Sequence, residues 1–156
     1  MSIDNVRKYL TRFNRENDIL EFPVSSATVQ LAAEALNVIP ARITKTLALK
    51  DGDGCMVIAV AGDGKIDNKK FKTEFGFKAK MLFPEETLEM TGHAVGGVCP
   101  FALPEGVKAY CDISMKRFDT VFPACGSSNS AIEVTCDELF EYSNAVKWID
   151  ICKDWE

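Results

Sequence analysis

Apolar residues recur every three or four positions in several parts of the chain, which is the spacing of amphipathic helices. In the first of these parts Ser2 or Asp4 offers a cap. The second part, residues 29–36, is preceded by serine and threonine residues and ends at Asn37. The third part, residues 68–75, lies between Asp67 and Gly76. This spacing predicts helices over five segments, 6–13, 29–36, 68–75, 84–91 and 137–142.

Shorter apolar runs rich in β-branched and aromatic residues predict strands. Residues 51–54, Asp-Gly-Asp-Gly, form a hairpin turn signal between two of them. The acidic turn is not a calcium loop, because the glutamate that such a loop requires falls at Gly62. The strand candidates are 19–22, 43–49, 56–61, 79–83, 107–111, 120–122, 131–135 and 146–151.

These strands do not alternate regularly with the helices, so a simple doubly wound sheet is not expected. No internal repeat or low-complexity linker divides the sequence. We therefore expect a single α/β domain over residues 1–156, with a mixed, curved, barrel-like sheet surrounded by helices.

Composition narrows the class of protein. The longest apolar runs, such as 56–61, are far too short to span a bilayer, and the first residues lack the layout of a secretory signal. The six cysteines form no C-x-x-C pair, and there is one histidine. We expect a cytoplasmic protein with reduced thiols, no membrane partner, and neither a metal site nor a cofactor.

A net charge of −5 argues against a broad basic face that holds nucleic acid, but not against contact with the end of an RNA. Six lysines do gather between positions 65 and 80. They suit either a solvated helix face or a weak phosphate-contacting patch.

Residues 91–101, Thr-Gly-His-Ala-Val-Gly-Gly-Val-Cys-Pro-Phe, hold three glycines and a proline between two apolar segments. Such a loop can turn successive backbone N–H groups toward one point and build an anion or oxyanion site. Glycine content alone fits a tight connection equally well.

Lys45 and His93 are the first candidates for chemistry. Lys45 interrupts an apolar strand segment, so it either faces solvent on an edge strand or lies in a cleft with a lowered pKa. His93 is the sole histidine, so an imidazole base has to be this residue, although a lone histidine is more often structural.

Cys99 and Cys125 are candidate nucleophiles without a visible histidine or asparagine partner at a motif spacing, and packing is the favoured role for both. Residues 127–130 can hydrogen-bond a ligand or simply build a turn. No G-x-S-x-G, Walker or dinucleotide fingerprint is present.

Three blocks together resemble a known family. They are Thr44-Lys45-Thr46-Leu47-Ala48-Leu49, the segment from Gly92 to Phe101, and Phe122-Pro123-Ala124-Cys125-Gly126. Their order and spacing are similar to those of the YbaK/EbsC group, free-standing relatives of the editing domain inserted in bacterial prolyl-tRNA synthetase. The resemblance runs from about Thr28 to the C-terminus.

The resemblance implies a trans-editing aminoacyl-tRNA deacylase, which hydrolyses the ester of a mischarged small amino acid. The implied partners are the 3′ end of an aminoacyl-tRNA and, as a further candidate, an aminoacyl-tRNA synthetase. It also implies that the backbone N–H groups of the loop from Gly96 to Pro100 hold the ester carbonyl, and that Lys45 binds the terminal nucleotide or that carbonyl. The implied catalytic residues are Lys45, Gly96, Gly97 and Val98, and the implied substrate-binding residues are Thr46, His93, Cys99, Pro100, Cys125, Gly126 and Ser127.

The chain departs from one branch of the family. Relatives that resemble Cys-tRNA(Pro) deacylases are expected to have an aspartate where Ala131 stands here, which leaves alanine, serine or another small amino acid open as the substrate. Two other functions also stay open. One is a thiol-dependent hydrolase that uses Cys125 or Cys99, and the other is a non-catalytic protein that binds a nucleotide or aminoacyl ligand.

Overall fold

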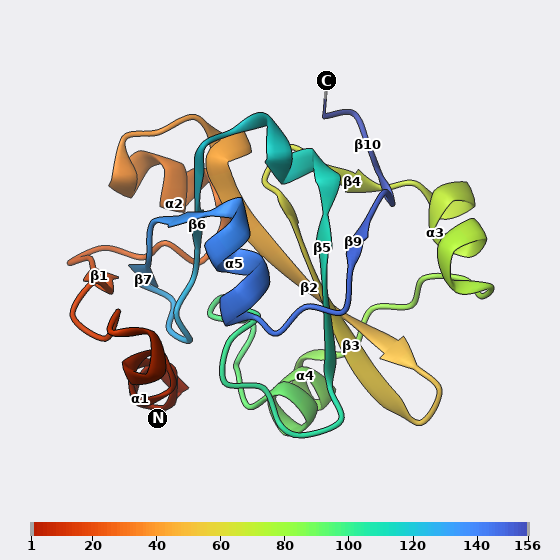
Figure 1. Cartoon of the computed structure of the whole chain (residues 1–156), viewed down its shortest axis with the longest axis horizontal. Coiled ribbons are helices and arrows are strands. Elements are labelled where there is room, and N and C mark those ends of the chain that lie inside the picture. The colour runs from red at the N-terminus through yellow and green to blue at the C-terminus, as the bar shows by residue number, and fades with distance from the viewer. Residues whose placement is uncertain (1, 156) are drawn as a thin grey trace.

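A computed structural model describes residues 2–155, and Figure 1 labels its elements. Short 3₁₀ turns at Thr11–Phe13, Pro40–Arg42 and Ile113–Arg117 join some of the elements. The helices are α1 (Ser2–Leu10), α2 (Val29–Leu36), α3 (Asn68–Phe75), α4 (Pro84–Thr91) and α5 (Cys136–Tyr142). The strands are β1 (Leu20–Glu21), β2 (Ile43–Asp51), β3 (Gly54–Ala61), β4 (Lys65–Ile66), β5 (Lys108–Asp112), β6 (Thr120–Pro123), β7 (Ser130–Ala131), β8 (Val134–Thr135), β9 (Trp148–Ile149) and β10 (Cys152–Lys153).

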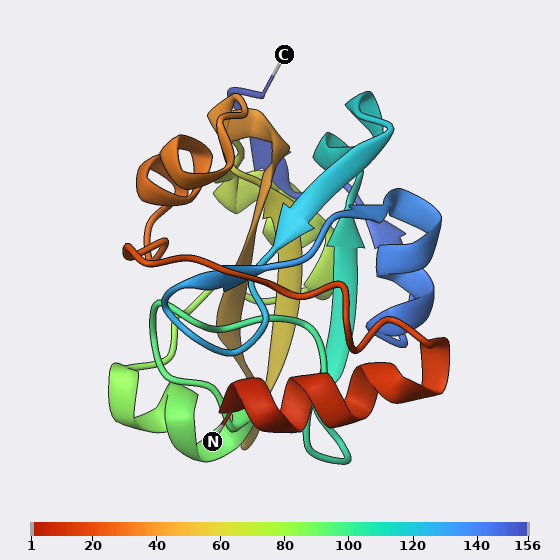
Figure 2. The same cartoon turned by 90° about the vertical axis from the view of Figure 1, so that its left-hand side faces the viewer.

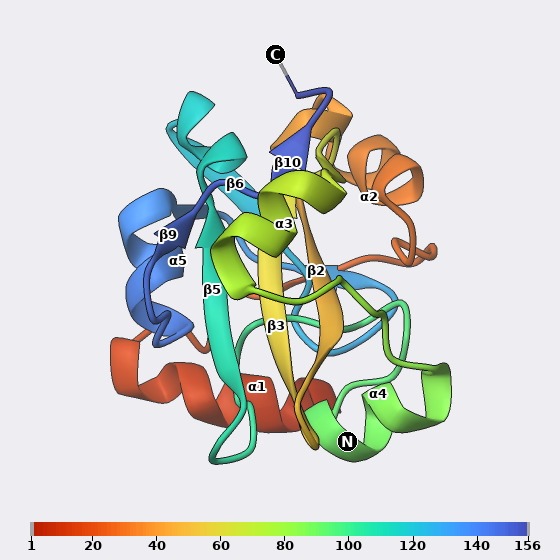
Figure 3. The same ribbon diagram turned by 90° about the vertical axis from the view of Figure 1, so that its right-hand side faces the viewer.

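The main sheet has six strands in the order β8-β6-β2-β3-β5-β9. Its centre is the β2–β3 hairpin, in which Thr44 pairs with Ala61 at one end and Asp51 with Gly54 at the turn. β6 runs parallel to β2, and β5 parallel to β3, whereas β8 is antiparallel to β6. The sheet is therefore mixed, and it curls into a half-barrel (Figures 1 and 3).

Both faces of the hairpin are buried, and alternation assigns each residue to one of them. Leu47 and Leu49 of β2 pack with Val60 and Ile58 of β3 in a core cluster that includes Phe71 of α3. Figure 3 shows α3 lying across this face. The opposite face carries the small side chains of β3, such as Ala59 and Ala61, against the cluster that contains α1 and α5 residues.

Most of the expected elements are confirmed, with their ends at the residues that physical chemistry favours. Thr28 caps α2 by accepting a hydrogen bond from the Leu31 N–H, and Asn37 ends that helix in the left-handed region, at φ 56°. Asp67 caps α3, which closes at Gly76. The mixed, curved α/β domain is the fold that the sequence predicts.

Three expected strands differ from the structure. Residues 79–83 form no strand and touch β2 through a single bridge between Leu49 and Met81, since Pro84 begins α4 directly afterwards. The expected strand 131–135 is divided into β7 and β8, and Ile132 between them donates its N–H to the Pro123 carbonyl. The expected strand 146–151 shrinks to β9, and Ile151 beyond it donates its N–H to the buried carboxylate of Asp112.

Two further details were not predicted. The short strand β4 pairs with β10 at the end of the chain, a non-local pairing that no local pattern announces. Ser2 is already part of α1, and its hydroxyl bonds a distant residue rather than capping the helix. No helix among residues 2–155 is both long enough and apolar enough to cross a membrane.

Candidate active site

A cavity of about 360 Å³ lies beside β2, where that strand separates from β6. Figure 2 shows the side of the molecule on which α2, α4 and the glycine loop surround the end of β6. The wall is mostly apolar, as is usual for a small-molecule site. The lining residues are Ser26, Ala27, Thr28, Val29, Ala32, Ile43, Thr44, Lys45, Thr46, Ala48, Met81, Leu82, Pro84, Thr87, Val95, Gly96, Val98, Phe122, Ala124, Ser130 and Ala131.

Lys45 is the one charged residue among the described residues that line this cavity. It is half-buried, and burial lowers the pKa of its ammonium group. The nearby charges of Cys152 and Asp63 raise the pKa of Lys45, but by less than burial lowers it. Neither of these two residues lines the cavity. No carboxylate in residues 2–155 forms a salt bridge with Lys45. Its charge is therefore not neutralised by an ion pair within these residues.

Thr46 follows Lys45 on the cavity wall. Its hydroxyl oxygen is buried and has no hydrogen-bond partner within the part of the chain that the structure describes. A buried hydroxyl without a partner costs free energy, so this position is not optimised for stability alone.

The glycine loop faces the cavity through Gly96 and Val98. The Gly97 N–H is not directed at the cavity, because it donates to the Ala94 carbonyl at 3.0 Å and closes a turn with Gly96 at φ 96°. No hydrogen bond within residues 2–155 uses the N–H groups of Gly96 or Val98. Two of the three expected amide donors of this loop therefore have no hydrogen-bond partner among the described residues.

Gly97 is where the loop meets the second small-residue turn. A Cβ added at Gly97 would lie 2.8 Å from the Ser127 nitrogen and 2.9 Å from the Gly126 carbonyl carbon. These are backbone atoms and cannot rotate away. A residue without a side chain is therefore required for the two turns to approach this closely.

His93 lies behind the loop and is 1% exposed. Its Nε2 is 2.8 Å from the Phe101 carbonyl, an acceptor, so Nε2 carries the proton and Nδ1 accepts a hydrogen bond from the Ser2 hydroxyl. Burial lowers the pKa of the imidazole. His93 thus ties α1 to both ends of the loop and does not reach the cavity wall.

The two candidate thiols are both fully buried. Burial raises the pKa of Cys99 to about 12 and the pKa of Cys125 well above its ordinary value. A thiol is a nucleophile only as the thiolate, so neither residue is prepared for attack at neutral pH. Neither lines the cavity.

The cavity wall thus includes Lys45, Thr46, Gly96 and Val98 from the sites expected from sequence. Ala131 also lines it, at the position where one branch of the family is expected to carry an aspartate. The remaining expected residues, Gly97, His93, Cys99, Pro100, Cys125, Gly126 and Ser127, lie outside the wall and support it from behind or stand near it.

The other side of the cavity consists of residues that no sequence motif marks. That side comes from the turn and first residues of α2, around Ala27 and Val29, and from the segment before α4, around Met81. In the sequence, both segments carry only helix and strand signals, and no polar motif marks them. In the described residues, no three histidine, cysteine, aspartate or glutamate side chains are grouped to hold a metal ion.

Comparison with known proteins decides the family. The model of the aminoacyl-tRNA editing domain matches residues 24–142, most of the chain. This protein belongs to the aminoacyl-tRNA editing domain family. The uncharacterised protein YwhH of Bacillus subtilis (strain 168) is 57% identical over the full length of both chains.

Two other relatives connect the chain with prolyl-tRNA synthetase. The proline–tRNA ligase of Kosmotoga olearia is 30% identical to this chain over 57% of the chain's length. The matched part is only 16% of the length of that ligase. A crystal structure provisionally assigned as a trans-editing enzyme for prolyl-tRNA synthetase superposes with a TM-score of 0.87 at 27% identity, over 97% of each chain. The resemblance to the editing domain of prolyl-tRNA synthetase is thereby confirmed.

Proposed function

We propose that this protein is a trans-editing aminoacyl-tRNA deacylase that hydrolyses the ester of a mischarged small amino acid. The observation that carries the proposal is the joint position of Lys45 and the free N–H groups of Gly96 and Val98 on one apolar cavity. Family membership supports the reaction class.

The chemistry requires few protein groups. A water oxygen attacks the ester carbonyl carbon, the carbonyl oxygen becomes an oxyanion, and the bond to the ribose oxygen breaks. The ribose oxygen takes up the proton, and a free amino acid and an uncharged tRNA are released. The vicinal ribose hydroxyl activates the ester and lies next to the reacting centre, so orientation of bound groups supplies much of the rate.

In this scheme the N–H groups of Gly96 and Val98 stabilise the oxyanion. Removal of one such donor in other acyl-transfer enzymes costs about 10²–10³ in kcat. Lys45 adds positive charge for the oxyanion or for the phosphate of the terminal nucleotide. The absence of a thiolate or an exposed imidazole from the described wall agrees with a reaction that needs no protein nucleophile.

The test is deacylation of tRNAs charged with cysteine, alanine, serine or threonine, on proline tRNA and on their cognate tRNAs. Wild type should hydrolyse at least one of these, and Lys45→Ala should lose most of that activity. Lys50→Ala is the matched control, because Lys50 lies on the same strand, outside the cavity, and pairs with Glu86 at 3.6 Å. Full activity of Lys45→Ala would contradict its assigned role, and inactivity of wild type across the panel would favour a ligand-binding protein.

A further inference from the structure

The edge of β2 is unpaired along the cavity. On one side the ladder with β6 ends at the pair of Thr44 and Pro123. Further along the same edge, the segment before α4 is attached to β2. There the Leu82 N–H donates to the Ala48 carbonyl at 3.1 Å, and the Lys50 N–H donates to the Lys80 carbonyl at 2.8 Å. Thr46 lies in the gap between these two attachments.

Alternation shows which way the Thr46 backbone points. The N–H and C=O of one residue in a strand point to the same edge, and successive residues point to opposite edges. Ala48 and Lys50 use the edge away from β3, so the even-numbered residue Thr46 presents its N–H and C=O there as well. No hydrogen bond within residues 2–155 uses either group at this edge.

The gap lies on the wall of the cavity. Thr44 and Ala48, the residues on either side of Thr46 that share its edge, both line the cavity, and so do Ala124 and Leu82 at the ends of the two attachments. Thr46 is only partly exposed, and its side-chain hydroxyl in the same wall is buried without a hydrogen-bond partner in the described residues. Backbone groups that lack protein partners in a mostly apolar wall favour a ligand that pairs with both of them.

We infer that the Thr46 backbone pairs with the aminoacyl group of the substrate as one residue of an added strand. An aminoacyl ester is a single amino-acid residue, with a donor at its α-ammonium group and an acceptor at its carbonyl. It can exchange two hydrogen bonds with Thr46 as two opposed residues do in an antiparallel sheet. This inference rests on the proposed deacylase function and specifies which substrates it accepts.

The arrangement agrees with oxyanion stabilisation by the loop, because a carbonyl oxygen has two lone pairs. One faces the Thr46 N–H, and the other faces the free amides of Gly96 and Val98 across the cavity. The α-ammonium group then donates to the Thr46 carbonyl. The pairing therefore selects acyl groups that carry a free α-amino group, and it makes no use of their side chain.

The experiment compares three acyl groups on one tRNA: alanyl, propionyl, which lacks the amino group, and N-acetylalanyl, which also adds bulk. If wild type prefers another amino acid, that residue and its deaminated and acetylated forms replace the alanine series. The measured quantity is the ratio of enzymatic kcat/KM to the uncatalysed hydrolysis rate, because the amino group itself activates the ester.

That ratio should fall about 10- to 100-fold for the propionyl ester, as expected for the loss of a charge-assisted hydrogen bond, and at least as far for the N-acetyl ester. Equal ratios for alanyl and propionyl esters would overturn the inference and leave the deacylase function intact. A third outcome is that the ratios are equal and activity is lost on a tRNA whose terminal adenosine is replaced by purine riboside. In that case the Thr46 backbone pairs with the adenine and not with the aminoacyl group. No hydrolysis of any aminoacyl-tRNA would instead refute the deacylase itself.

A protein variant gives a second, independent arm. Thr46→Pro removes the N–H at the open edge, and because this N–H is not part of the β3 ladder, no strand hydrogen bond is lost. Its kcat/KM on alanyl-tRNA should fall about 10-fold or more for the loss of that donor, with the melting temperature measured alongside. A folded Thr46→Pro protein with wild-type kcat/KM would overturn the inference.

Discussion

Gly97→Ala tests whether the position of the glycine loop sets the activity. The added Cβ would stand 2.8 Å from the Ser127 nitrogen, where ordinary contact begins at 3.4 Å. One turn has to retreat by about 0.6 Å, and overpacking of this kind costs about 1–3 kcal/mol of unfolding free energy. Displacement of a positioning group by 1 Å can lower a rate about 100-fold, so a shift of this size should cost about 10-fold.

Two assays separate the two effects of Gly97→Ala. Thermal or urea unfolding gives the loss of stability, and deacylation per folded molecule gives the loss of positioning. Gly106→Ala is the matched control, since Gly106 is not among the residues that line the cavity, and at φ 93° its added Cβ has nothing within 4 Å. The free energy of unfolding of Gly106→Ala should fall by about 1 kcal/mol, because alanine is strained at a positive φ, and its deacylation activity should be unchanged. A Gly97→Ala protein as active and as stable as wild type would refute the reasoning.

Two further predictions concern the buried groups behind the loop. Because burial lowers the pKa of His93 below its ordinary 6.5, the unfolded chain binds the extra proton first, and the unfolding free energy should fall as pH drops from about 6.5 toward 5. That slope should be weaker in His93→Gln, measured by urea unfolding, and an identical slope would contradict it. Cys99 and Cys125 should resist iodoacetamide in the native protein at pH 8, because burial raises the pKa of both thiols. Rapid alkylation of either, read by mass spectrometry, would contradict the burial of these thiols.

The fold was predictable wherever the signal was local. The Asp-Gly-Asp-Gly turn determines the register of β2 and β3, and Asp67 and Gly76 determine both ends of α3. The errors arose where a distant group competes with the local pattern. Residues 79–83 have the composition of a strand but meet β2 at one bridge, and the pairing of β4 with β10 joins segments more than eighty residues apart.

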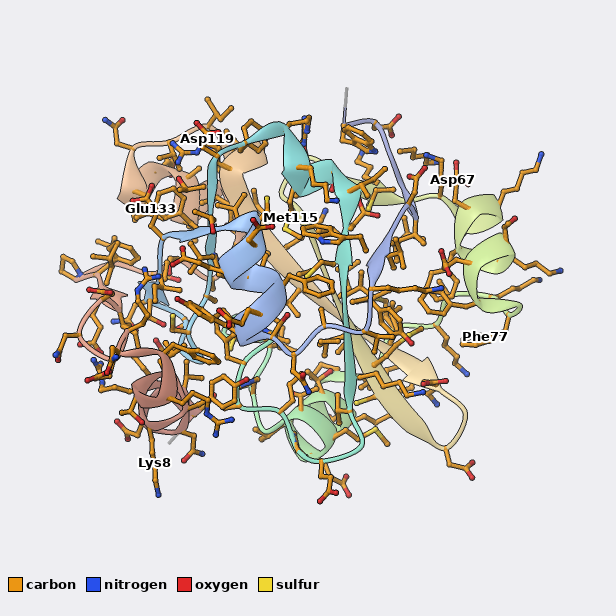
Figure 4. All side chains as sticks on the ribbon, in the orientation of Figure 1. Lys8, Asp67, Phe77, Met115, Asp119 and Glu133 are labelled. Carbon is orange, nitrogen blue, oxygen red and sulfur yellow. The ribbon has the colours of Figure 1, made fainter. Side chains whose placement is uncertain are left out.

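In the candidate site, too, the residues that a local pattern marks were predictable, and the contacts between distant residues were not. Lys45 and Gly96 were found because a lysine in an apolar strand and a glycine-rich loop are unusual in sequence. Ser2 was expected only as a helix cap, and nothing in sequence connects it with His93. Figure 4 shows why contacts of this kind are hard to foresee, since side chains from widely separated parts of the chain fill the space between the helices and the sheet.

The most informative part of the site is a missing hydrogen-bonded pair rather than a side chain. A strand edge between two attachments is normally closed, because unpaired backbone groups cost stability and invite other chains to pair. Here Ala48 and Ala124, at the ends of the two attachments, line the cavity together with Gly96 of the loop. In the proposed arrangement, the backbone of Thr46 is paired by a ligand that enters this cavity. Every residue type but proline supplies the same backbone donor and acceptor. Such a site can therefore pair with the common part of every aminoacyl group, while its apolar wall limits the side chain.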